Sequence, residues 1–199
     1  MQDNYQIQAQ NAKQYFLHYD QEALIGKHRL KADRDFLYLT FFSQPYRICR
    51  KTGDLDCLQD GHWQERRSHG EVMTILDLLC DSREDRHLSG ELQNMQAFGH
   101  QFHQNLGEQN PDARLFQNCP KNLHQGCLAL RGVPFNAGDI AYSIPVFEDL
   151  QIVLQFWEGD EEFAPRLRFL WDKNALQYLK YETMYFAVDV LMGYLKQHL

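Results

Sequence analysis

Apolar residues recur along this chain at two spacings, which predict helices in some segments and strands in others. Helical spacing is clearest over residues 69–80, where four apolar residues stand at positions i, i+3, i+4 and i+7. They are Val72, Ile75, Leu76 and Leu79. A long C-terminal helix is predicted over residues 175–197, which are rich in Leu, Tyr and Met. Shorter helices are predicted over residues 5–18 and 21–25, the second capped by Asp20 and ended by the glycine that follows it.

Two groups of segments are instead rich in aromatic and β-branched residues, as strands are. Turn residues separate the members of the first group, which indicates a β-meander. This group covers residues 35–42, 46–50 and a short segment that ends at Leu58. The second group consists of residues 139–144, 151–157 and 166–171. Strands that follow one another through short turns pair antiparallel.

The predicted fold class is therefore α+β. We expect one antiparallel or mixed sheet built from the β-meander and the second strand cluster, with helices packed mainly on one face and a long C-terminal helix. A chain of 199 residues fits a single domain over residues 1–199, because a chain of this size favours a single core. No regular β-α-β alternation and no glycine-rich phosphate loop is present in the sequence.

The composition and net charge of the chain indicate which kinds of partner it can bind. The chain is 44% hydrophobic and 13% aromatic, which is enough apolar material for a core and argues against disorder. Its formal net charge of −7 repels phosphate backbones and anionic lipids, so we expect neither nucleic-acid nor membrane binding by this acidic protein. Since no apolar run reaches the length of a membrane span and the first residues are polar, a cytoplasmic location is predicted.

The five cysteines are odd in number and widely spread along the chain. In a reducing compartment such residues are expected to be free thiols. No Cys-x-x-Cys pair occurs, so the spacing predicts neither a zinc ribbon nor a ferredoxin-type cluster.

The segment 157–163 (WEGDEEF) contains four carboxylates within five residues, flanked by two aromatic side chains. Such a turn would attract a cation or a basic partner, and the aromatic rings could wall a pocket. The candidate ligand-binding residues are Trp157, Asp160, Glu161, Glu162 and Phe163. The alternative is a solvated hairpin turn whose aromatic residues anchor it to the core, since its Gly-Asp pair suits a turn.

Two His/Cys pairs are candidates for metal binding. His100 and His103 are three residues apart, and so are His124 and Cys127, so each pair can share one face of a helix. Together the four groups could form a tetrahedral zinc site or supply an axial ligand to a tetrapyrrole. The alternative is a set of surface histidines with a core cysteine, because the sequence does not show that the two segments meet.

Cys119 precedes a helix predicted to begin at Pro120 and to end before Gly132. A thiol at the N-cap lies at the positive end of the helix dipole, which would favour a nucleophilic or redox role with His124 as a base. The alternative is a small buried residue at the start of the helix.

Several short motifs carry a resemblance to a known family. They are residues 88–91 (LSGE), 130–134 (LRGVP), 138–142 (GDIAY), Val146-Phe147 and 157–163 (WEGDEEF). Together they resemble a domain-of-unknown-function family of anaerobic bacteria and archaea, from about residue 25 to the C-terminus. Some members of that family are fused to an iron–sulfur domain like that of corrinoid iron–sulfur proteins. The resemblance implies a setting in anaerobic metabolism but supplies no catalytic residue, and this chain lacks the cysteine spacing of the fused domain.

Two functions remain open from the sequence. The first is an accessory module that binds a small ligand or cofactor, or a protein partner, in anaerobic metabolism of the corrinoid or one-carbon type. The second is a metal-dependent or cysteine-dependent enzyme that uses the His100/His103 pair and the Cys119/His124/Cys127 group. The identity of a cofactor is not given by any motif.

Overall fold

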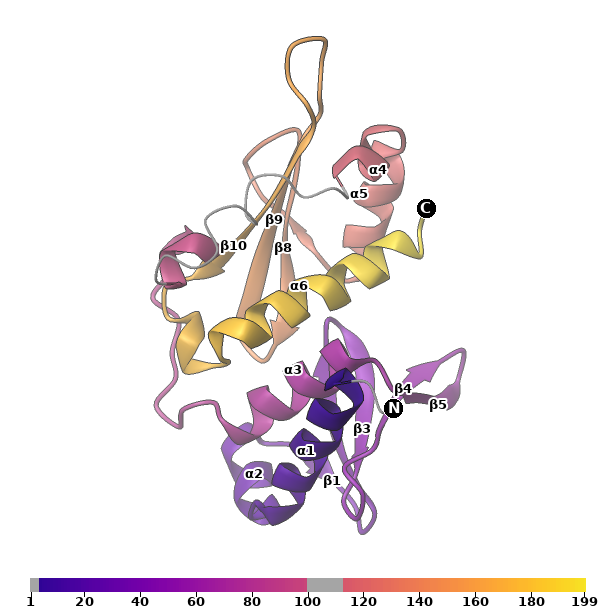
Figure 1. Cartoon of the computed structure of the whole chain (residues 1–199), viewed down its shortest axis with the longest axis vertical. Helices are drawn as coiled ribbons and strands as arrows, with labels where there is room; N and C mark the ends of the chain where they lie inside the picture. Colours follow the sequence, from indigo (N-terminus) through magenta and orange to yellow (C-terminus); the bar gives the residue numbers. More distant parts are fainter. Residues whose placement is uncertain (1–3, 100–112) are drawn as a thin grey trace. The chain divides into compact units, whose positions relative to one another are not determined.

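The computed structural model describes residues 4–99 and 113–199 of the chain. Its internal contacts divide the chain into two compact units (Figure 1). Unit 1 comprises Met1–Arg86 and Gln177–Val190, and unit 2 comprises His87–Leu176 and Leu191–Leu199. Each unit contains one five-stranded sheet. A single domain over residues 1–199 stays a prediction.

Unit 1 combines three N-terminal helices, a β-meander and the first part of the C-terminal helix. Its strands pair in the order β1-β2-β3-β4-β5, and every pair is antiparallel. The helices are α1 (Asn4–His18), α2 (Gln21–His28), α3 (His69–Cys80) and the start of α6 (Tyr181–Lys196). The strands are β1 (Lys31–Ala32), β2 (Phe36–Phe41), β3 (Gln44–Cys49), β4 (Leu55–Gln59) and β5 (His62–Arg66).

The meander follows the alternation of its side chains, because successive residues of a strand point to opposite faces. In β2, Leu37, Leu39 and Phe41 are buried while the residues between them are more exposed. Two-residue turns with positive φ join β2 to β3 and β4 to β5, the second through Asp60 and Gly61. Such turns match the right-handed twist of paired strands and so fix the register of the hairpins.

Helix α3 is the centre of unit 1, since nine of its twelve residues are buried. Its first turn holds Glu71, whose side chain is only 3% exposed and pairs with Arg66 at 2.8 Å. The hydroxyl of Tyr46 donates to the same carboxylate at 2.5 Å. A buried carboxylate needs such partners, and here they join α3 to β3 and β5.

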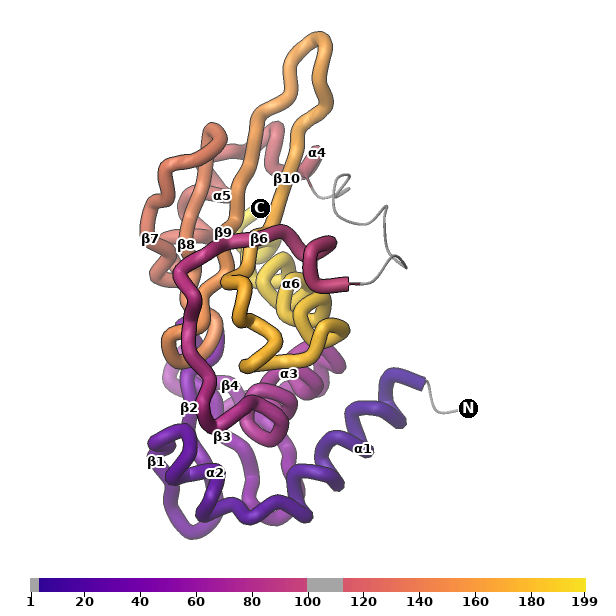
Figure 2. Tube along the Cα trace, turned by 90° about the vertical axis from the view of Figure 1, so that its left-hand side faces the viewer, coloured from indigo at the N-terminus to yellow at the C-terminus, as the bar shows by residue number. Residues whose placement is uncertain are grey.

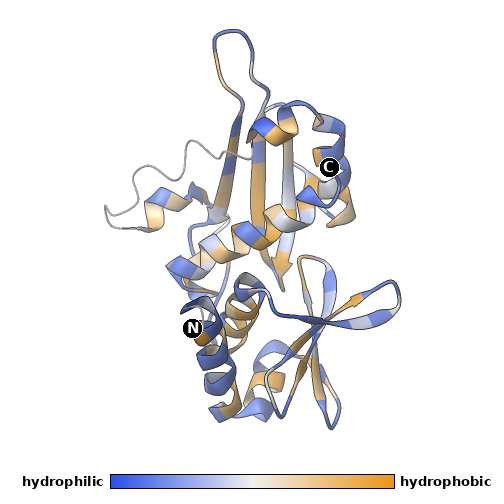
Figure 3. Ribbon diagram, turned by 45° about the vertical axis from the view of Figure 1, so that its right-hand side comes forward, coloured by the Kyte–Doolittle hydropathy of each residue, from blue (hydrophilic) through white to orange (hydrophobic). Residues whose placement is uncertain are grey.

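Unit 2 also contains one antiparallel sheet, with the strand order β6-β10-β9-β8-β7. Figure 3 shows apolar residues concentrated along its three long strands and polar residues at the far turn of the longest hairpin. The strands are β6 (Leu92–Asn94), β7 (Val133–Pro134), β8 (Ile140–Phe147), β9 (Leu150–Trp157) and β10 (Arg166–Asp172). The helices are η1 (Met95–Phe98), α4 (Ala113–Gln117), α5 (Pro120–Ala129), η2 (Ala175–Gln177) and the end of α6. The last residue of η2, Gln177, belongs to unit 1.

The α+β class, the antiparallel pairing and the C-terminal helix are confirmed. The expectation of one sheet is wrong, because the two strand clusters form separate sheets of five strands each. Helix α2 continues past the predicted end at Gly26 to His28, and its C-cap, Arg29, takes the left-handed conformation. Strand β5 was not predicted, because its sequence, HWQER, is mostly polar. None of the described helices combines the length and the hydropathy that crossing a membrane requires.

A single carboxylate fixes the connection that leads into β6 of unit 2. Asp172, at the end of β10, accepts four hydrogen bonds between 2.8 and 3.0 Å. Three come from Ser89 and Gly90, and the fourth from the amide of Asn174. Gly90 has a φ of +79°, which glycine adopts without strain. Burial opposes ionisation of Asp172, but the hydrogen bonds outweigh it and hold the pKa of the carboxyl below its ordinary value.

Replacing Asp172 with Asn should destabilise the protein by about 2 kcal/mol at pH 7, because an amide cannot accept all four bonds. The lowered pKa gives a stabilisation that is present above the unfolded value and lost as the pH falls through the folded value. The deficit of D172N should therefore shrink as urea unfolding is measured from pH 7 down to pH 3. Asp149→Asn, at an exposed turn of the same unit, is the matched control. An equal loss of stability in both variants would contradict the role of Asp172 in fixing this connection.

Candidate functional site

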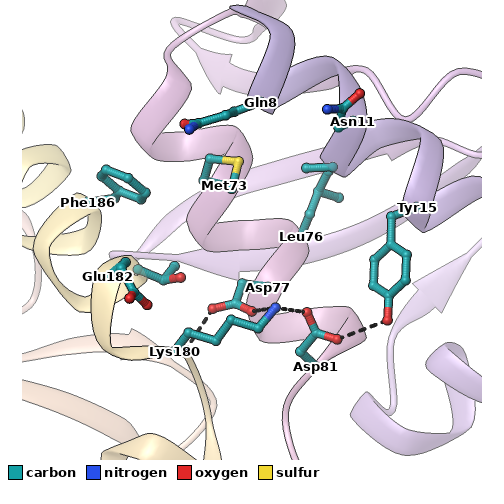
Figure 4. A pocket seen from close by; sticks show the side chains of 12 residues that line it. Gln8, Asn11, Tyr15, Met73, Leu76, Asp77, Asp81, Lys180, Glu182 and Phe186 are labelled. Carbon is teal, nitrogen blue, oxygen red and sulfur yellow. Dashed lines mark hydrogen bonds and ion pairs between the residues drawn. The ribbon is translucent and has the colours of Figure 1, made fainter. Parts of the chain in front are cut away.

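A cavity of about 600 Å³ opens in unit 1 among α1, α3 and the start of α6 (Figure 4). All of its lining residues belong to this unit. They are Gln8, Asn11, Ala12, Tyr15, Met73, Leu76, Asp77, Asp81, Lys180, Glu182, Thr183 and Phe186. Its volume lies in the range of small-molecule sites.

Helical spacing explains how the wall from α1 arises. Gln8, Asn11, Ala12 and Tyr15 recur at intervals of three, one and three residues, so they share one face of the helix. Helix α1 packs against α3. The face of α1 that lines the cavity is mostly polar, so it leaves hydrogen-bonding groups at the rim.

A three-residue ionic network forms one end of the cavity. The ammonium of Lys180 lies 3.2 Å from Asp77 Oδ1 and also pairs with Asp81 Oδ2. Figure 4 shows the two carboxylates on either side of this ammonium. The backbone amide of Lys180 donates to Asp77 Oδ2 at 2.8 Å, and Tyr15 donates to Asp81 Oδ1 at 3.3 Å. The network thus joins α1, α3 and the residue that precedes α6.

Burial decides the electrostatics of this network. The side chain of Asp77 is 5% exposed, and burial raises the pKa of its carboxyl. The amide and ammonium of Lys180 and the side chain of Thr183 offset this effect only in part. For Lys180, partial burial opposes the charge, but Asp81 and Asp77 outweigh it and raise the pKa of the ammonium. Lys180 is therefore the resident counter-ion of Asp77.

Apolar side chains form the middle of the cavity, and amide groups form the other end. Met73, Leu76 and Phe186 lie between the ionic network and the amides of Gln8 and Asn11 in Figure 4. Further contacts hold two of these residues in place. The ring of His69 meets Phe186 edge-on at 4.7 Å, and its Nε2 lies 3.0 Å from Gln8 Oε1. The cavity therefore combines apolar walls with a few fixed polar groups, as ligand sites do.

The acidic turn lies elsewhere, in unit 2, where it joins β9 to β10 at the end of a hairpin that extends beyond its own sheet (Figure 2). Asp160 Oδ1 accepts from the amides of Glu162 and Phe163, each at 2.8 Å, and these bonds lower the pKa of the carboxyl. Gln117 of α4 holds Gly159 through both of its amide atoms. This geometry is that of the structural alternative, a hydrogen-bonded hairpin turn.

The aromatic residues of the acidic turn differ in exposure. Phe163 is 68% exposed. Trp157 ends β9, and the guanidinium of Arg168 lies 5.5 Å from its ring centre. Ligand binding by Trp157, Asp160, Glu161, Glu162 and Phe163 stays a prediction.

Only half of the predicted metal site can be located. His100 and His103 lie outside the described residues. His124 and Cys127 both belong to α5. Cys127 is buried, and this burial raises the pKa of its thiol to about 12. His124 is exposed, and its Nδ1 lies 2.5 Å from the hydroxyl of Tyr142. Within residues 4–99 and 113–199, no three His, Cys, Asp or Glu side chains are placed to hold a metal ion. The four-ligand site stays a prediction.

Cys119 is the N-cap of α5, as its sequence position indicated, and Pro120 is the first helical residue. Its thiol donates to the carbonyl of Leu115 at 3.0 Å. Cys119 and His124 therefore each have a different partner, Leu115 and Tyr142 respectively. All five cysteines of the chain are free.

The family model described as a domain of unknown function, DUF3786, matches residues 20–194. The chain belongs to the DUF3786 family. The match spans parts of both units and includes every segment that carries the family resemblance in the sequence. Comparison of this DUF3786 chain with curated proteins and with solved structures gave no match.

Sequence reasoning missed the cavity in this DUF3786 chain, although one signal was present. Asp77 interrupts the apolar run of α3, where Leu76 precedes it and Leu78 follows it. A charge inside such a run requires a partner. The partner, Lys180, lies 103 residues away in the sequence, so spacing could not identify it.

Replacing Lys180 with Ala should destabilise the protein by about 2 kcal/mol at pH 7, because it leaves Asp77 buried without its counter-ion. The loss is smaller than for a fully buried pair because the Lys180 side chain is 61% exposed. Since the folded pKa of Asp77 lies above its unfolded value, the deficit should grow as the pH rises from 4 to 7. Urea unfolding of K180A and of Lys173→Ala, whose pair with Glu91 is exposed, gives the comparison. Equal stability of the two variants at pH 7 would refute the role of Lys180.

The acidic turn allows a second test, because its carboxylates differ in whether they accept hydrogen bonds from backbone amides. Asp160→Ala removes the acceptor of two backbone amides and should increase hydrogen exchange at Glu162 and Phe163. Glu161→Ala should leave that exchange unchanged, because among the described residues Glu161 makes no such bond. Loss of protection in both variants, or in neither, would show that the turn does not depend on Asp160.

Proposed function

We propose that this chain is a small-ligand-binding module and that its site is the cavity among α1, α3 and the start of α6. The single observation that carries the proposal is the cavity itself, with its volume of about 600 Å³ and its mixed lining. Known small-molecule sites have similar volumes, with apolar walls and a few orienting polar groups. In this cavity the ionic network and the two amides supply the orienting groups.

The cellular setting is a further part of the proposal. An accessory role in anaerobic metabolism, of the corrinoid or one-carbon type, is supported by the family resemblance of the sequence. A cytoplasmic location is supported by the five free cysteines. A cofactor or a protein partner remains compatible with this module.

The enzyme alternative, with the His100/His103 pair and the Cys119/His124/Cys127 group, stays a prediction. Burial of Cys127 raises the pKa of its thiol to about 12, which disfavours the reactive thiolate. The Cys119 thiol is engaged by Leu115 and the His124 ring by Tyr142. Among the described members of this group, no contact therefore favours catalysis over binding.

Binding in the cavity can be tested with 4-ethylphenol, a neutral probe with an aromatic body and one hydroxyl. Saturation-transfer NMR should detect binding to the wild-type protein. Ala12→Phe places a ring in the cavity and should abolish the signal. Ala23→Phe, at an exposed position of α2 outside the cavity lining, should keep it.

Melting curves of both variants check that each is folded. An undiminished signal with folded A12F would overturn the proposed site.

A further inference from the structure

The cavity has two polar ends separated by an apolar middle. Gln8 and Tyr15 lie seven positions apart on α1, which corresponds to about 10 Å along the helix axis. Tyr15 stands beside the ionic end, while Gln8 and Asn11 mark the amide end (Figure 4). The space between them suits a ligand with an apolar body and a polar group at each end.

The charge of the lining determines which polar group fits the ionic end. Asp77, Asp81 and Glu182 contribute carboxylates, and Lys180 is the only cation among the described residues of the lining. The cavity is therefore negative whether Asp77 is ionised or protonated. Because Lys180 is already held by two carboxylates, an anionic ligand would meet a net repulsion here.

At the ionic end, some carboxylate oxygens can still accept a hydrogen bond from a ligand. The side chain of Glu182 is exposed and, within the described parts of the chain, forms no hydrogen bond or ion pair. Asp81 Oδ1 receives only the 3.3 Å bond from Tyr15. Asp77 is 7% exposed, and its Oδ1 accepts no hydrogen bond of good geometry although the Lys180 ammonium is 3.2 Å away. The ionic end thus has unused acceptors in a negative field.

The lining favours an organic cation over a metal ion. Among residues 4–99 and 113–199, no three carboxylate, His or Cys groups converge on one point as metal ligands must. Phe186, Met73 and Leu76 instead offer an apolar surface beside the carboxylates. An aromatic ring next to an ammonium adds a favourable cation–π attraction.

We infer that the ligand of this cavity is an organic ammonium ion with an apolar body. Its ammonium group binds at Glu182, its body packs on Phe186, Met73 and Leu76, and a hydrogen-bonding group at its other end reaches the amides of α1. This inference rests on the proposed function, because it names the ligand class of the same site.

A matched set of three probes tests the ligand class. Tyramine carries an ammonium, 2-(4-hydroxyphenyl)ethanol replaces it with a neutral hydroxyl, and 3-(4-hydroxyphenyl)propionate replaces it with a carboxylate. Dissociation constants from NMR titration should be about 10-fold lower for tyramine than for the alcohol, the size expected for one charge-assisted hydrogen bond. The carboxylate should bind more weakly than both.

Variants identify the group that recognises the ammonium. Glu182→Gln should weaken tyramine binding about fivefold, which is the scale of a partly exposed ion pair, and leave binding of the alcohol unchanged. Glu84→Gln, an exposed carboxylate of unit 1 outside the cavity lining, should change neither. Raising the salt concentration should weaken tyramine binding more than binding of the alcohol.

The outcomes separate this inference from the function on which it rests. If the alcohol or the carboxylate binds as tightly as tyramine, the cavity is a ligand site but not one for ammonium ions. If E182Q does not weaken tyramine binding, Glu182 is not the anchor and the inference is overturned. If neither tyramine nor 4-ethylphenol binds to the wild-type protein, the proposed site itself is wrong.

Discussion

The cavity of unit 1 depends on one buried carboxylate and the lysine that neutralises it. Asp77 lies in α3 among buried apolar residues, and Lys180 supplies both its ammonium and its backbone amide to it. The two bonds fix the chain just before α6 begins, which places Glu182 and Phe186 at the cavity wall. The position of these two wall residues is therefore tied to the cost of burying Asp77 without a counter-ion.

Local sequence signals predicted individual helices and strands better than the way in which these pack together. The spacing of α3 and the Asp20 cap of α2 were readable because each depends on neighbouring residues. Strand β5 was missed because its sequence is mostly polar, although it pairs with the neighbouring strand β4. The separation of the two sheets depends on pairing between strands, which periodicity does not encode. The cavity was hidden for the same reason, since Asp77 and Lys180 meet only after folding.

The motifs that carry the family resemblance have backbone roles in unit 2. Gly90 presents its amide to Asp172, and a side chain at Gly138 would come within 2.7 Å of the Phe156 carbonyl. The acidic turn is organised by Asp160 and held by Gln117. The eye-catching residues of the sequence thus have structural roles in unit 2 of this chain, whereas the candidate site uses less conspicuous side chains.

The paired ammonium of Lys180 has a consequence for chemical labelling. Amine-reactive reagents attack the neutral amine, and the raised pKa of Lys180 keeps that form scarce even though its side chain is 61% exposed. Lys173 is exposed to a similar extent at 57%, and among the described residues Glu91 is the one carboxylate that pairs with it. A low acylation yield at Lys180 would therefore report its ionic environment rather than its accessibility.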